Sequence, residues 1–388
     1  MHIFKDSPGN NRLAPLWPTY APYPFPLTAG RAEQVFDAEG TAYLDFYGGH
    51  CVASTGHSHP AVAGALAAQA RQLLFYSAAA RLPVRDAAAA ALVEFAPAGL
   101  VSAFFCNSGA EANESALKLA AQITGRRRFT AFRGSFHGRS LLALSVTDDP
   151  RLKRGLDGLT APVEFLPFAD HAALMAADFG ESAAVIVEPI QSMAGVRCAP
   201  RAWFEALREK CSREGALLIF DEVQTGVGRL GVPFAAGLYG VTPDFLTLAK
   251  GIASGVPMAA LLMTASMAAL LKSGDLGSTF GGGPLASAAL IATLEVIQRE
   301  KLMQNAALQA ERIRTGLAGT VVREVRGEGL LLGLAAGSHA AALKQHLQDR
   351  RILVGGSSDP EVLRLMPPLN VSSASVDALL AAIRDFRP

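Results

Sequence analysis

The sequence predicts an α/β protein, with a three-layer large domain built on a mostly parallel sheet and a smaller α+β domain. Between about residues 60 and 280, short apolar runs alternate with segments of helical periodicity, the pattern of parallel strands joined by helices. Several of these runs are continuously apolar, which indicates strands buried on both faces. The expected strands cover residues 102–106, 129–133, 184–188, 217–221, 245–249 and 259–263.

The domain boundaries follow from changes in this pattern. Residues 1–50 are rich in proline and predict an extended arm and then a hairpin that turns at Gly40, both assigned to the small domain. Residues 51–284 form the predicted large domain. From Pro284 a long helix leads into a short α+β section, so residues 285–388 are assigned to the C-terminal small domain.

The composition argues against several classes of function. Half of the 388 residues are apolar, and 35 Lys+Arg nearly balance 34 Asp+Glu. Without a basic surplus we expect neither a nucleic-acid nor a membrane partner. The N-terminus lacks an apolar signal core, and no uncharged apolar run reaches the ~18 residues of a membrane span. The cysteines form no Cys-x-x-Cys pair, so we expect reduced thiols and a cytoplasmic protein.

The motif Asn107-Ser-Gly-Ala-Glu-Ala-Asn113 lies between an apolar strand and a helical run. Small residues there would let a ligand approach the backbone, and a helix N-terminus offers free N–H groups with partial positive charge. A phosphate-binding site is one interpretation. A plain strand-to-helix turn capped by Ser108 is the other, and the motif alone does not separate them.

Two further motifs place charged side chains at the ends of expected strands. Asp221 ends the run LLIFD, at the sheet edge where open α/β folds bind ligands, and a buried carboxylate needs a partner such as a protonated ring nitrogen. A capped helix start is the alternative. Lys250 closes the run FLTLA, where burial would make its amine a nucleophile towards carbonyls. A surface lysine is the alternative there.

Two weaker patterns are not favoured as sites. Residues 226–231, GVGRLG, fit the dinucleotide pattern G-x-G-x-x-G, but they do not directly follow a strand and Pro233 comes soon after. His57 and His59 lack a third metal ligand at a recognisable spacing. Turn and capping roles are favoured for them, and we expect no metal.

Taken together, these segments resemble the class III aminotransferases, a family of fold-type-I enzymes that use pyridoxal phosphate (PLP). The resemblance runs from about Phe36 to Leu369 and is nearest to the acetylornithine and ornithine aminotransferases. Its motifs, in the family's order, are FDAEGTAYLDF, GHSHP, NSGAEANESALKLA, SFHGRS, VEPIQ, IFDEVQTGVGR, TLAKGIASGVPMAA, STFGGGPLA, VRGEGLLLGL and RLMPPL.

The resemblance implies roles for several residues at the cofactor. Lys250 would form a Schiff base with it and then move the substrate proton, while Asp221 would hold the pyridinium nitrogen. Glu188 would support the ring, Gln224 would contact the ring oxygen and Phe136 would stack on the ring face. The other implied cofactor contacts are Ser108, Gly109, Ala110 and His137, with Ser278 and Thr279 from the second subunit of a homodimer with shared active sites.

For the substrates, the resemblance implies a small-molecule amino donor and a 2-oxo acid acceptor. The implied binding residues are Arg139 and Arg364, whose guanidinium forks suit carboxylates, together with His50 and Tyr20. Two positions depart from the ornithine-type pattern. Met193 stands where a glutamate is usual, one thought to mask the carboxylate-binding arginine in one half-reaction. His50 stands where an aliphatic or aromatic residue is usual.

The sequence therefore predicts a PLP-dependent transaminase that moves a terminal amino group of an ornithine-like donor to a 2-oxo acid such as 2-oxoglutarate. Other reactions on the same cofactor stay open as alternatives, namely an aminomutase or an amino-acid racemase, as does a transaminase for a different ω-amino acid or amine. A binding protein that has lost catalysis is a further alternative. The presence of both Lys250 and Asp221 argues against it.

Overall fold

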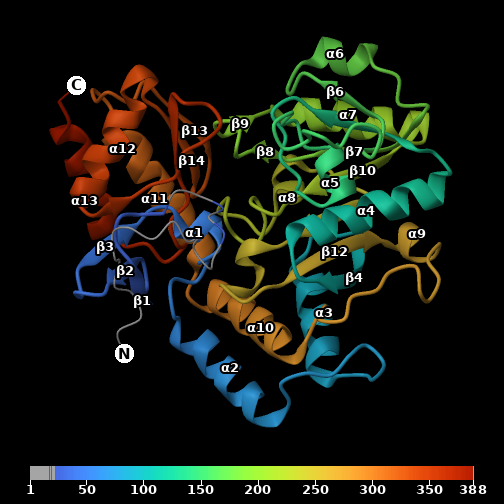
Figure 1. Ribbon diagram of the computed structural model, residues 1–388, viewed down its shortest axis with the longest axis horizontal. Helices are drawn as coiled ribbons and strands as arrows, with labels where there is room; N and C mark the ends of the chain where they lie inside the picture. The colour runs from blue at the N-terminus through green and yellow to red at the C-terminus, as the bar shows by residue number, and fades with distance from the viewer. Residues whose placement is uncertain (1–16, 18, 20–21, 388) are drawn as a thin grey trace, which may run out of the picture.

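The computed structural model of the protein describes Trp17, Thr19 and residues 22–387. Figure 1 shows a larger lobe around a central sheet and a smaller lobe in which N-terminal strands (blue) lie beside C-terminal elements (red). The predicted α/β class, with a mostly parallel sheet and a smaller α+β part, is confirmed.

The central sheet has seven strands: β11, β10, β7, β5 and β6 pair in parallel, whereas β12 is antiparallel to both its neighbours, β11 and the edge strand β4. The order across the sheet is β4 (Leu100–Cys106), β12 (Ala259–Thr264), β11 (Phe245–Leu248), β10 (Leu217–Asp221), β7 (Ser182–Val187), β5 (Arg128–Phe132) and β6 (Val163–Leu166). Every predicted strand is present. The edge strand β6 is an addition, because its short run VEFL carries a glutamate and gives no continuous apolar signal.

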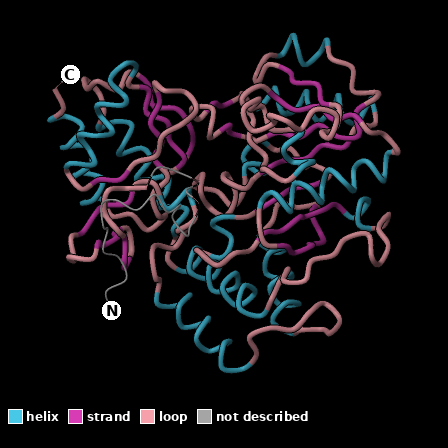
Figure 2. The backbone as a smooth tube through the Cα atoms, in the orientation of Figure 1, coloured by secondary structure: helices cyan, strands magenta, loops and turns pink. Residues whose placement is uncertain are grey.

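Alternate residues of the central strands pack into opposite layers. Leu218 and Phe220 of β10 join the core that includes α7 (Arg201–Glu214), whereas Ile219 joins the core that includes α4 (Gly109–Thr124). Both faces of the sheet are therefore covered, which explains the continuously apolar strand runs. Figure 2 shows the helices (cyan) enclosing the strands (magenta) of this lobe.

The remaining helices of the larger lobe surround the sheet and its edges. They are α2 (Pro60–Gln72), α3 (Pro83–Phe95), α5 (Leu141–Ser145), α6 (His171–Ala176), α8 (Ala235–Tyr239), α9 (Ala265–Ala268) and α10 (Pro284–Arg299). Helix α10 packs against α2, α3 and the 3-10 turn η1 (Lys250–Ala253). The division predicted at residue 284 thus falls at the start of a helix that contacts the larger lobe, and it remains a prediction.

The smaller lobe joins both ends of the chain. The predicted hairpin is formed by β2 (Gln34–Asp37) and β3 (Ala42–Asp45), with Gly40 in a left-handed conformation at a φ of 81°. The other elements are β1 (Leu27–Arg31), α11 (Leu302–Gly316), β13 (Glu324–Glu328), β14 (Leu331–Ala335), η2 (Gly337–His339), α12 (Ala340–Asp349), β15 (Ile352–Leu353), β16 (Val362–Leu365) and α13 (Ser373–Asp385). Its sheets have the orders β1-β2-β3-β15 and β13-β14-β16.

Among the segments that link the lobes, two short ones lie near the strand ends. The turn α1 (Gly48–Cys51) contacts η1, and all its residues have positive φ, including His50 at 65° and Cys51 at 69°. The second segment is the hairpin of β8 (Ile190–Gln191) and β9 (Arg197–Cys198), which leaves the central sheet after β7 and contacts β13. Both segments bring residues of the small lobe towards the sheet edge where Asp221 lies.

Candidate active site

The parallel strands end at one edge of the central sheet, and a cavity of about 520 Å³ opens there. Its walls come from the segments that follow β4, β5, β7, β10 and β11. The lining residues that the sequence predicted are Ser108, Gly109, Ala110, Phe136, His137, Arg139, Glu188, Asp221, Gln224 and Lys250. Most of the predicted site residues therefore surround one cavity.

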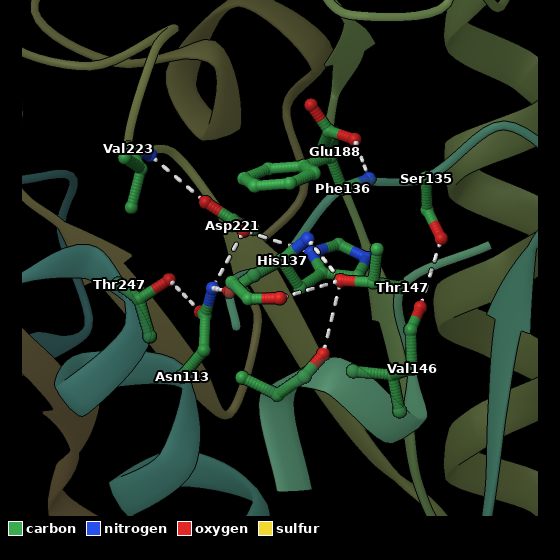
Figure 3. Close-up of polar contacts among 12 residues, drawn as sticks. Asn113, Ser135, Phe136, His137, Val146, Thr147, Glu188, Asp221, Val223 and Thr247 are labelled. Carbon is green, nitrogen blue, oxygen red and sulfur yellow. Dashed lines mark hydrogen bonds and ion pairs between the residues drawn. The ribbon is translucent and has the colours of Figure 1, made fainter. Parts of the chain in front are cut away.

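Asp221 lies at the end of β10 and is only 4% exposed. One carboxylate oxygen accepts a hydrogen bond from Nδ2 of Asn113 at 2.7 Å and lies 2.8 Å from Nδ1 of His137, while the other accepts the backbone N–H of Val223 at 3.0 Å (Figure 3). These partners meet the requirement that a buried carboxylate be hydrogen-bonded. No helix begins directly after Asp221, so the capping alternative does not hold for it.

Asn113 is the central residue that sequence reasoning missed. Its amide also donates to the carbonyl of His137 at 2.8 Å, and its Oδ1 accepts the hydroxyl of Thr247 at 2.6 Å. The backbone N–H of His137 in turn donates a hydrogen bond to Oγ1 of Thr147 at 2.9 Å. Figure 3 shows these side chains converging around Asp221. One signal was present in the sequence, because Asn113 follows Gly109 by one helical turn and so shares its helix face.

Two buried glutamates at this edge have different tasks. Burial raises the pKa of Glu188, which lines the cavity, to about 7, and its Oε1 accepts the backbone N–H of Phe136 at 2.9 Å. Burial also raises the pKa of Glu222 to about 7, but its oxygens accept the N–H groups of Ala235 and Ala236 at 2.7 and 2.8 Å. Glu222 thus caps the start of α8.

Lys250 follows β11 and begins η1 with a φ of 49°. Desolvation lowers the pKa of its amine, and the charges of Asp221 and Glu188 oppose this shift. Within residues 22–387, no hydrogen-bond acceptor is paired with Nζ, and the side chain lines the cavity. An unpaired amine with a lowered pKa is suited to attack a carbonyl, so the alternative of a surface lysine does not hold.

The N-terminus of α4 forms another part of the cavity wall. Ser108 caps the helix, since its Oγ accepts the N–H of Glu111 at 3.2 Å. The N–H groups of Gly109 and Ala110 precede the first helical hydrogen bond and remain available to a ligand. A Cβ at position 109 would lie 2.9 Å from Cγ2 of Val223, so a larger residue there requires Val223 or the start of the helix to shift. The capping interpretation of the motif is therefore confirmed for Ser108, and phosphate binding by the next two amides, which the free N–H groups permit, remains a prediction.

Arg364 lies on β16 of the small lobe and is 2% exposed. Its Nη1 donates to Oγ of Ser192 at 3.0 Å and its Nε to the carbonyl of Gly356 at 2.6 Å. No carboxylate of the described residues is within ion-pair distance of it. Arg139 differs, because it is exposed and lines the cavity directly.

His50 lies near enough to Arg364 and Lys250 to feel both positive charges. Burial lowers the pKa of its imidazole, and the charges of Arg364 and Lys250 lower it further. The hydroxyl of Tyr47 is 2.8 Å from its Nε2. Tyr20, the other predicted substrate residue, lies outside the described residues.

Ser278 and Thr279 do not line the cavity of the single chain. Oγ of Ser278 accepts a hydrogen bond from Nδ2 of Asn107 at 3.2 Å and another from the backbone N–H of Gly281 at 3.1 Å. Thr279 is exposed. The loop therefore reaches the residue that precedes the α4 cap within its own chain, which the sequence did not indicate. Its contribution to the site of a second subunit remains a prediction.

The two weaker motifs have structural roles in the fold. Nδ1 of His59 accepts the N–H of Ala61 at 3.2 Å, which confirms its predicted capping role at the start of α2. His57 has its Nε2 2.7 Å from a carboxylate oxygen of Asp45. Residues 226–231 form turns between β10 and α8 rather than a strand-to-helix junction.

The site combines an unpaired lysine, a hydrogen-bonded carboxylate and a free helix N-terminus. These three groups fit the three reactive parts of PLP: the lysine fits the aldehyde, the carboxylate the ring nitrogen, and the helix N-terminus the phosphate. Comparison with known proteins gives the same class. The Aminotransferase class-III model matches residues 18–386, and the chain belongs to this family. It is therefore an enzyme with PLP as its cofactor, and the resemblance seen in the sequence is confirmed.

Similar proteins cover nearly the whole chain. The acetylornithine aminotransferase of Streptomyces coelicolor is 43% identical over 365 residues, which are 92% of this chain and 90% of that protein. The LysW-aminoadipate semialdehyde/glutamate semialdehyde transaminase of Sulfolobus acidocaldarius is 37% identical, covering 92% and 94%. The crystal structure of ornithine aminotransferase from Toxoplasma gondii has a TM-score of 0.89 at 31% identity, covering 95% and 91%. These relatives do not favour an aminomutase or a racemase.

Proposed function

We propose that this enzyme transfers the terminal amino group of an ornithine-like donor, with N-acetylornithine as the first candidate, to 2-oxoglutarate. One observation carries the proposal: the amine of Lys250, with its lowered pKa, shares a cavity with Asp221 and with the free amides of α4. Relatives that act on acetylornithine and on an aminoadipate semialdehyde support the choice of donor.

Each residue of the cavity has a definite task in this proposal. PLP, when bound, supplies an electron sink for negative charge on the substrate carbon. The N–H groups of Gly109 and Ala110, at the positive end of α4, bind the phosphate. Asp221, fixed by Asn113 through a 2.7 Å hydrogen bond, keeps the ring nitrogen protonated. Nζ of Lys250 would hold the cofactor covalently in the resting enzyme and, once the substrate amine has replaced it, would be free to accept and return the substrate proton.

The remaining residues select and orient the substrates. Arg364 and Arg139 bind carboxylates, Arg364 from a buried position and Arg139 from an exposed one. Glu222 cannot mask Arg364 in place of the missing glutamate at Met193, because its oxygens are occupied at the start of α8. We therefore propose that Arg364 stays open to substrate throughout, so that terminal and α-amino groups are discriminated less sharply.

The test is an assay of the purified protein with 2-oxoglutarate and one donor at a time, in which glutamate formation is measured. N-acetylornithine, ornithine and 4-aminobutyrate form the donor panel, and Lys250→Ala is expected to lose activity by ~10³-fold or more because it lacks the proton carrier. The wild type should hold PLP in a borohydride-reducible link that Lys250→Ala lacks. Such a link in the variant, or a wild type inactive with every donor, would contradict the proposal.

A homodimer is the proposed assembly. Several large apolar side chains near the Ser278 loop are exposed, among them Leu74, Tyr76 and Phe280, and the ring of Phe280 lies 5.0 Å from that of Phe75. Exposed apolar side chains gathered in this way are typical of interaction surfaces. This surface supports a dimer in which Ser278 and Thr279 reach the partner's phosphate site.

The proposed compartment is the cytoplasm. In the described part of the chain, no helix is long and apolar enough to cross a membrane. The cysteines Cys51, Cys106, Cys198 and Cys211 are all free thiols. Free thiols support a reducing compartment.

A further inference from the structure

Ser192 lies between two residues of the proposed site, although it does not line the cavity. It is fully buried, directly after β8. Its hydroxyl accepts a hydrogen bond from Nη1 of Arg364 at 3.0 Å and donates to Oε1 of Gln224, also at 3.0 Å. A serine hydroxyl can accept and donate at once, so one side chain connects both partners.

Within the described part of the chain, no carboxylate lies within ion-pair distance of Arg364, and Glu188 acts on its charge only from farther away. Its two hydrogen-bond acceptors, Ser192 and the carbonyl of Gly356, are neutral. The buried acids of the site have other partners: Asp221 is bound by Asn113, Glu188 accepts the N–H of Phe136, and Glu222 caps α8. A desolvated guanidinium without a counter-ion attracts an anionic ligand.

The hydroxyl is also held firmly in place. The next residue is Met193, whose backbone carbonyl accepts two hydrogen bonds from Ser358. The backbone N–H of Ser358 donates one at 2.7 Å, and the hydroxyl of Ser358 donates the other at 2.8 Å. This pair of bonds ties the segment after β8 to the small-lobe loop that leads into β16. The segment that carries Ser192 is thus bonded to the same lobe that carries Arg364, which favours a constant distance between the hydroxyl and the guanidinium.

We infer that Ser192 is a positioning residue for substrate carboxylates: it fixes one arm of the Arg364 guanidinium with a neutral oxygen, and it joins that arm to Gln224 at the cofactor. The other arm, Nη2, has no hydrogen-bond partner in the part of the chain that is described and is left for the ligand. This inference rests on the proposed function, because it takes Arg364 as the carboxylate site. It adds a residue whose neutrality keeps that site open in both half-reactions.

The probe is glutarate, a dicarboxylate with no amino group, titrated into the PLP-loaded enzyme by calorimetry. Wild type is expected to bind it, and Ser192→Ala to bind about tenfold more weakly, the cost of a hydrogen bond to a charged group. Ser192→Thr keeps the hydroxyl and should stay within about threefold of wild type. Ser182→Ala is the matched control, because it removes another fully buried hydroxyl, one that bonds Thr130 and does not touch Arg364 or Ser192, and it should bind glutarate as wild type does.

A second readout separates positioning from general damage. The kinetics of two donors with four-carbon chains are compared: 4-aminobutyrate, which carries a carboxylate, and n-butylamine, which does not. In Ser192→Ala, KM for 4-aminobutyrate should rise about tenfold with kcat little changed, while KM for n-butylamine should not move.

Two results would overturn the inference: wild type that does not bind glutarate, or a folded Ser192→Ala that binds it with unchanged affinity. An enzyme that binds glutarate as expected but forms no glutamate from any donor would instead refute the proposed function alone.

Discussion

Glu188 shows how burial changes a single carboxyl at this site. Burial raises the pKa of Glu188 from 4.5 to about 7, so between these values the native state holds a proton that the unfolded chain has lost. The stability contributed by this proton is complete below pH 4.5 and is lost as the pH rises through about 7.

The corresponding variant is Glu188→Gln, which keeps the oxygen that accepts the Phe136 N–H but cannot ionise. We expect the Tm of wild type to fall more steeply than that of the variant between about pH 5 and pH 7, because only wild type loses the stabilising proton. Thermal melts of both proteins across this range, with and without PLP, measure the difference. Parallel Tm profiles would show that Glu188 keeps an ordinary pKa.

At the scale of single residues, the sequence predicted the side chains whose chemistry is local. Lys250 and Asp221 end apolar strands, and Gly109 begins a helix, so each is recognisable from its own segment. Asn113 and Ser192 could not be assigned in this way. Their partners lie 108 and 172 residues away along the chain, and which pairs meet depends on the order of strands in the sheet.

Helix α4 is the element on which the proposed phosphate binding depends. The Cβ of a Gly109→Ala variant would lie 2.9 Å from Cγ2 of Val223, so either the Val223 side chain or the start of the helix must shift. Such overpacking costs about 1–3 kcal/mol, and we expect PLP to dissociate about tenfold more readily. The dissociation constant is measured by titrating the cofactor-free protein. Gly64→Ala in α2 is the control, because nothing lies within 4 Å of its Cβ; equal PLP affinity in both variants would contradict the prediction.

Among the elements, long apolar strands and capped helices were predictable, whereas short pieces were not. β10 and β11 lie inside the sheet, and all their residues are apolar except Asp221 and Thr247. β8 and β9 have two residues each, too few to show a period. Yet this hairpin carries Ser192 to Arg364, so a segment without a sequence signal determines part of the site.

For the whole molecule, the shared site of the proposed dimer can be tested by complementation. Lys250→Ala and Thr279→Ala are each expected to be nearly inactive alone. After the two are unfolded together and re-paired, roughly a quarter of all sites should be intact, because half of the dimers are mixed and each has one complete site. The measurement compares the activity of the re-paired mixture with the activity of each variant alone. No recovery, or a fully active monomer in sedimentation, would refute the shared site.

The pairing of β15 with β3 has a consequence for how the chain is made. Ile352 lies beside Leu44, so the four-stranded sheet joins segments from opposite ends of the sequence. During synthesis the hairpin of β2 and β3 leaves the ribosome early. One edge of β3 then stays unpaired until β15, near the end of the chain, has also been synthesised. Contacts so distant in sequence form slowly, and an unpaired edge is prone to aggregation in the meantime. The smaller lobe is thus the last part of the enzyme to close.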